Sequence, residues 1–91
     1  MHATPNQIAT WKHDIKNIKY DIENLHTFIP IFGAISTENQ QLIMGNINNI
    51  IGELVEIGLK AHNYSIGHTC KELVINAFSL LYTLYKAQLS T

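Results

Sequence analysis

Arginine is absent from this sequence: all six basic residues are lysines, and seven acidic residues give a net charge of −1 at pH 7. Most phosphate and nucleic-acid recognition relies on the bidentate guanidinium group, so this absence argues against both kinds of ligand. Lys12, Lys16 and Lys19 lie close together in the sequence, but acidic residues are interspersed among them. We therefore expect no basic face and no binding of nucleic acid.

Cysteine is nearly absent as well, and the single Cys70 cannot form an intrachain disulfide. One unpaired cysteine is typical of a protein from a reducing compartment. The N-terminal segment has neither the basic start nor the apolar stretch of a signal peptide. The longest uncharged run in the C-terminal half, residues 73–85, is too short and too polar to cross a bilayer. The expected location is the cytoplasm, with no membrane partner.

The motifs of the common catalytic and cofactor sites are also missing, including a glycine-rich phosphate loop, His-Glu-x-x-His and Gly-x-Ser-x-Gly. Side chains that can bind metals do gather in one segment, at His62, His68, Cys70 and Glu72. Their spacing matches no established zinc pattern, and the apolar neighbours of Cys70 favour a buried structural thiol. We expect no enzyme, no cofactor and no metal site.

What the sequence does contain is a regular alternation of apolar residues. A chain of 91 residues that is 46% hydrophobic fits one folded domain, residues 1–91, and is too apolar to be disordered. Apolar residues recur at steps of three and four, the spacing of one face of an α-helix. Three such segments predict helices over about residues 5–29, 37–62 and 65–88. Their seams are Ile8, Trp11, Ile15, Ile18, Ile22, Leu25 and Ile29; Ile43, Ile47, Ile50, Leu54, Ile57 and Ala61; and Ile66, Cys70, Leu73, Ala77, Leu80, Leu84 and Ala87.

Local signals predict where the helices begin and end. Thr4 and Gln7 form a capping box at the start of the first helix. Thr37 and Gln40 offer a second capping box at the start of the next one. Pro30 disfavours the helical conformation in the residue before it, so it ends the first helix. The connecting loops are short and force neighbouring helices to run antiparallel, which predicts an all-α, antiparallel three-helix bundle.

The third helix carries more apolar residues than one bundle seam requires. Ile75, Phe78, Tyr82 and Tyr85 form a second stripe, expected on roughly the opposite side from the seam. A helix that is apolar on two sides must be covered on both. In the second helix, residues 39–52 carry no charge, and two glycines seven residues apart favour the close approach of another backbone. The predicted interface for self-association comprises Met44, Gly45, Ile51, Gly52, Ile75, Phe78, Tyr82 and Tyr85.

The alternative for these residues is that they belong to the internal core, with the tyrosines at its boundary. The first helix also leaves two interpretations open. Lys12 and Lys19 occupy heptad position e, and Asp14 and Asp21 occupy position g. In a parallel coiled coil these positions would pair Asp against Lys. The same charges also fit the solvated flank of a bundle helix, which is the interpretation we favour because three heptads are too few to define a coiled coil.

Two classes of function follow. The first is a non-enzymatic helical protein–protein interaction module: a small oligomeric adaptor or inhibitor that binds itself, as a dimer or higher homo-oligomer, and another protein. Frequent Ile, Asn and Lys without Arg are typical of AT-rich genomes, which favours a phage-encoded or mobile-element-encoded modulator of a host protein. The alternative is a small-ligand-binding or regulatory helical bundle, in which Tyr82 and Tyr85 line a site between subunits.

Overall fold

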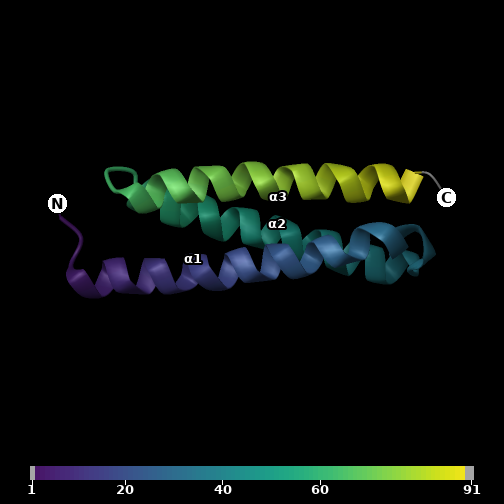
Figure 1. Ribbon diagram of the computed structural model, residues 1–91, viewed down its shortest axis with the longest axis horizontal. Helices are drawn as coiled ribbons and strands as arrows, with labels where there is room; N and C mark the ends of the chain where they lie inside the picture. The colour runs from purple at the N-terminus through teal and green to yellow at the C-terminus, as the bar shows by residue number, and fades with distance from the viewer. Residues whose placement is uncertain (1, 90–91) are drawn as a thin grey trace.

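The computed structural model describes residues 2–89, and over that range it contains helices and no strand. An α-helix α1 (Pro5–Leu25) is followed by a 3₁₀ segment η1 (His26–Ala34), then by helices α2 (Thr37–Lys60) and α3 (Ser65–Leu89). The three α-helices lie side by side along the long axis of an elongated molecule of 50 × 17 × 17 Å (Figure 1). The predicted all-α bundle is confirmed, and residues 1, 90 and 91 of the predicted domain lie outside the described range.

The start of α1 confirms the predicted capping box. The Thr4 hydroxyl accepts a hydrogen bond from the backbone N–H of Gln7 at 3.1 Å, and the Gln7 side chain accepts one from the Thr4 backbone N–H at 2.9 Å. The two bonds satisfy donors that have no partner inside the helix. A further contact holds this end of α1 to the turn between α2 and α3, since the rings of Trp11 and Tyr64 lie 6.2 Å apart.

The predicted end of the first helix at residue 29 is wrong, because α1 ends at Leu25 and the predicted loop over 30–35 is largely the 3₁₀ segment η1. Pro30 has no N–H to donate, so a regular α-helix cannot pass through it. The His26 ring contacts the Ile22 carbonyl oxygen through Nδ1 at 2.8 Å, at the last turn of the helix. The tighter turn of η1 carries Phe32 into the core, where it is fully buried.

The predicted capping box of the second helix is also wrong. The capping residue of α2 is Ser36, whose hydroxyl accepts a hydrogen bond from the Asn39 backbone N–H at 3.3 Å. Gln40 does not reach back to the cap: its side chain turns inward and donates from Nε2 to the Phe32 carbonyl oxygen at 2.8 Å. That carbonyl also accepts from the Ile35 backbone N–H at 3.2 Å, so the glutamine supplies a second donor in the interior instead of a bond at the helix end.

The core lies along the shared axis of the three helices, and the packing is most extensive between α2 and α3. The predicted seams supply most of the core residues. Within residues 2–89, no helix is long and apolar enough to span a bilayer. Both ends of α2 and both ends of α3 fall within two residues of the predicted positions. The buried apolar residues are Ile15, Ile18, Ile22, Phe32, Ile47, Ile51, Leu54, Ala61, Ile66, Cys70, Leu73, Ala77, Leu80 and Leu84.

Candidate protein–protein interface on helices α2 and α3

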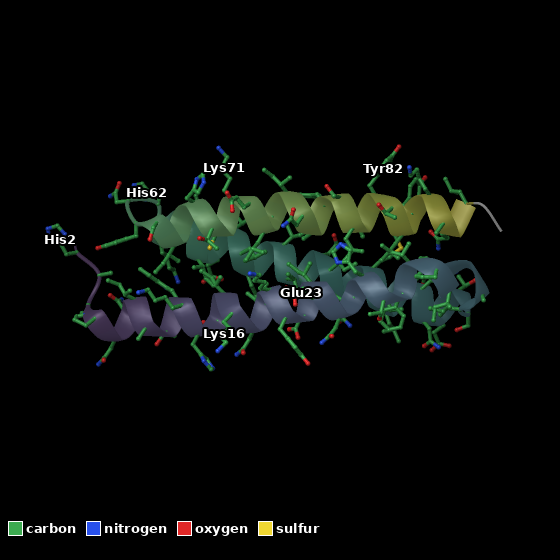
Figure 2. All side chains as sticks on the ribbon, in the orientation of Figure 1. His2, Lys16, Glu23, His62, Lys71 and Tyr82 are labelled. Carbon is green, nitrogen blue, oxygen red and sulfur yellow. The ribbon has the colours of Figure 1, made fainter. Side chains whose placement is uncertain are left out.

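The second apolar stripe of α3 is exposed to solvent. The exposed fractions are 57% for Ile75, 54% for Phe78, 61% for Tyr82 and 48% for Tyr85. These residues do not lie directly opposite the seam, because they line hollows that α3 shares with α2. Figure 2 shows Tyr82 and Lys71 pointing from α3 away from α1. The stripe therefore occupies the flank of α3 that borders α2, on the side that α1 leaves uncovered.

Helix α2 supplies the other half of this surface. Near one end, Met44 lines a hollow of about 300 Å³ together with the aromatic residues of α3. Near the α2–α3 turn, Val55 and Leu59 line a second hollow of about 330 Å³. We call the combined surface the α2–α3 face. Gly45 and Gly52 lie fourteen and seven residues before Leu59 on α2, and Leu89 lies seven residues after Tyr82 on α3, so helical spacing places them on the same side as the residues that line the hollows. The face consists of Met44, Gly45, Gly52, Val55, Leu59, Val74, Ile75, Phe78, Leu81, Tyr82, Tyr85 and Leu89.

The structure places the predicted interface residues on this face with one exception. Ile51 is only 8% exposed and belongs to the core cluster, so its side chain is not available to a partner. Met44 and Gly45 are half-buried and Gly52 is exposed. A Cβ atom added at Gly45 or Gly52 would meet no atom within 4 Å. Nothing inside the protomer therefore requires glycine at these two positions.

Two other glycines, Gly58 and Gly67, shape the hollow near the turn, and neither was predicted from the sequence to belong to this face. A Cβ atom on Gly58 would lie 3.3 Å from the Cβ of Cys70, so α2 and α3 approach closely here. A Cβ atom on Gly67 would lie 2.5 Å from the Ala61 carbonyl oxygen, which no side chain tolerates. The sequence feature that could have identified these two glycines is that they lie on either side of the second loop.

Charge is sparse on the α2–α3 face. Lys71 lines the hollow near the turn. At the rim, the Glu56 carboxylate pairs with the Lys60 ammonium group at 3.0 Å, and both side chains are exposed. At the other end, the Lys86 ammonium group lies 5.1 Å from the centre of the Tyr82 ring. The face is therefore mainly apolar, with Lys71, Glu56, Lys60 and Lys86 as its nearby charges.

The candidate metal ligands do not come together. His68 Nε2 pairs with a Glu72 oxygen at 3.1 Å on the surface, and His62 Nδ1 contacts the Leu59 carbonyl oxygen at 3.1 Å. Within residues 2–89, no three histidine, cysteine or acidic side chains are grouped so that they could hold a metal ion. Cys70 is 1% exposed, and burial raises the pKa of its thiol.

The seam of α1 is occupied within the protomer. Its central residues Ile15, Ile18 and Ile22 are buried against the other helices, so they cannot also form a coiled-coil seam with a second α1. The flanking Lys12 and Lys19 are exposed. This arrangement agrees with the interpretation of the charged positions as a solvated flank.

Comparisons of this chain with protein-family models, with curated proteins and with solved structures found no match.

Proposed function

We propose that this protein is a non-enzymatic helical interaction module, an adaptor or inhibitor that docks onto protein partners through the α2–α3 face. The observation that carries the proposal is the set of exposed apolar side chains that line two hollows between α2 and α3, among them three half-exposed aromatic side chains. Soluble monomers rarely expose an apolar patch of more than a few hundred Å² unless it binds something. Aromatic residues with few charges at the centre are also the usual composition of an interface core.

The shape of the face favours a helical partner. α2 and α3 run antiparallel, and the groove between them has Val74 and Leu81 as half-buried floor residues. An amphipathic helix laid in such a groove covers apolar side chains from both walls and extends the bundle by one layer. The polar groups on offer, chiefly Lys71 and the two tyrosine hydroxyls, would contribute orientation rather than most of the affinity.

The proposal is tested with two adjacent lysine substitutions. Phe78→Lys places a charge at the centre of the face, whereas Ser79→Lys places the same charge on the exposed surface outside it. Proteins cross-linked to the tagged chain in cells of its source should be retained by Ser79→Lys and lost with Phe78→Lys. Both variants should keep the helical circular dichroism spectrum of the wild type. Equal capture by the two variants would contradict the proposal.

One observation favours the ligand-binding alternative. The hollow of about 300 Å³ beside Tyr82 and Tyr85 reaches the lower end of the size range of small-molecule pockets, which is roughly 300–1,000 Å³. A second chain would have to close it. A metabolite that raises the melting temperature of the wild type, but not of Tyr85→Ala, would support this class of function.

A further inference from the structure

The contacts between the antiparallel helices α2 and α3 show which of their residues lie at the same position along the bundle axis. We call such residues level with each other. Gly58 lies beside Cys70 near the turn, and Gln88 Nε2 donates to Gln40 Oε1 at 3.1 Å near the other end. Counting along both helices from these contacts places Gly45 level with Tyr82 and Gly52 level with Ile75. The match holds to within about one residue, or ~1.5 Å along the axis.

In both pairs of level residues, a glycine on α2, which has no side chain, lies beside an exposed side chain that projects from α3. Gly45 and Gly52 are seven residues apart on α2, and a Cβ on either would find open space. Ile75 and Tyr82 are also seven residues apart, on α3, and more than half of each is exposed. Each protomer therefore carries two projections and two gaps, at the same two levels and on the same face.

We infer that the α2–α3 face binds a second copy of this chain, about a twofold axis parallel to the helices. This inference rests on the proposed function and names its partner. Such a rotation keeps every residue at its level and exchanges the two sides of the groove. α3 of each copy then lies across α2 of the other, with Tyr82 opposite the partner's Gly45 and Ile75 opposite the partner's Gly52. The contacts occur twice, once in each direction.

A twofold axis perpendicular to the helices fits less well. It would place α2 of one copy across α2 of the other, and α3 across α3. The glycines of α2 would then face a helix that carries no projecting aromatic side chain. The two α3 helices would meet projection against projection, at Phe78 and Tyr82.

The charged residues near the face also fit a twofold axis parallel to the helices. Lys71 on α3 is level with Glu56 on α2, to within about one residue by the same counting. The rotation that seats Tyr82 against the partner's Gly45 therefore brings Lys71 toward the partner's Glu56, and does so twice. Lys86 comes level with the neutral segment around Gln41 and Leu42, so it does not face a like charge there. Opposite charges at matching levels favour this pairing over others.

The exposed area also matches a dimer. The four side chains of the α3 stripe, Ile75, Phe78, Tyr82 and Tyr85, are about half exposed and present roughly 400–500 Å² of apolar surface per copy. A standard stable interface buries about 800 Å² on each partner, of which about 60% is apolar. The stripe alone therefore supplies most of the apolar area that one side of such an interface buries.

Sedimentation velocity of the full chain tests the inference with one variant and one control. Gly52→Leu fills the gap opposite the partner's Ile75, and the new side chain has open space in the protomer. Asn49→Leu adds an apolar side chain to α2 on the side toward α1. The wild type and Asn49→Leu should sediment as dimers at micromolar concentration. Gly52→Leu should raise the dimer dissociation constant about tenfold or more. At dilutions where all three chains are monomers it should be at least as stable to heat as the wild type, because leucine favours a helix more than glycine does.

The outcomes separate the inference from the proposed function. A wild type that is monomeric at high micromolar concentration overturns the second copy as the partner. A Gly52→Leu variant that dimerises as well as the control overturns the arrangement in which Ile75 lies opposite the partner's Gly52. The proposed docking function fails only if Phe78→Lys and Ser79→Lys capture the same proteins. A dimer weakened by Gly52→Leu and by Phe78→Lys supports both.

Discussion

Gln40 shows most clearly how one residue depends on the fold around it. Among residues 2–89 it is the one polar side chain in the buried class, and it joins η1 to α3 by donating to the Phe32 carbonyl oxygen and accepting from Gln88. Gln40→Ala should lower the free energy of unfolding by about 1–3 kcal/mol, because it removes the hydrogen bonds to Phe32 and Gln88 and leaves the Phe32 carbonyl oxygen with only the Ile35 backbone N–H as donor. Gln41→Ala, at the exposed neighbouring position, should change it by less than about 0.5 kcal/mol. Urea denaturation of the two variants measures the difference, and equal values would contradict the role of Gln40.

The buried thiol of Cys70 makes the stability of the protein depend on pH. Burial raises the pKa of its thiol above the unfolded value, so the stability this thiol contributes is complete below the unfolded pKa and is lost as the pH rises through the folded one. The free energy of unfolding of the wild type should therefore fall relative to that of Cys70→Ala as the pH rises above the ordinary thiol pKa of about 8.5. The native thiol should also react slowly with a bulky thiol reagent. Parallel pH profiles for the two chains would show that the thiol does not titrate differently on unfolding.

At this scale, periodicity predicted which residues of the helices are buried but not which isolated residues are. The seam positions from Ile66 to Leu84 were predicted individually, because regular spacing on a helix decides which side faces the core. Phe32 was not, since its burial depends on the turn geometry of η1. Ile51 was predicted in the interface and lies in the core, because it is close enough in angle to Ile47 and Leu54 to join their buried side.

At the scale of elements, the approximate start of each helix was predictable from the sequence, but the residue that caps it was not always predictable. α1 has one good capping residue and the prediction was correct. α2 has two adjacent candidates, Ser36 and Thr37, and nothing in the local sequence decides between them once Gln40 is drawn into the core. Likewise, Pro30 marks the end of an α-helix, but the continuation as η1 depends on packing against α3 that the sequence pattern does not encode.

The start of α2 gives a direct test of the capping residue. Ser36→Ala should lower the free energy of unfolding by about 1 kcal/mol, because the Asn39 backbone N–H loses its acceptor. Thr37→Ala should be nearly neutral, since Thr37 is the first residue of the helix itself and is exposed. Thermal unfolding of both variants measures the contrast. The reverse order of effects would place the cap at Thr37.

At the scale of the whole molecule, the surplus of apolar residues was visible in the sequence, whereas its location was not. Counting stripes on α3 indicated that a three-helix bundle could not cover them all. The structure adds that the second stripe lies beside α2 rather than opposite the core. That placement joins the aromatic residues of α3 to Val55 and Leu59 in one face. The match between glycines and projecting side chains becomes visible only once the levels of the two helices are known.

The most direct test of this account is an isotope-filtered nuclear Overhauser experiment on an equal mixture of isotope-labelled and unlabelled chains, which detects contacts between different molecules only. If the α2–α3 face pairs with a second copy as inferred, the ring protons of Tyr82 should show intermolecular contacts to the Hα protons of the partner's Gly45. Intermolecular contacts from Tyr82 to the partner's Lys71 instead, or none in a sample that sediments as a dimer, would contradict it.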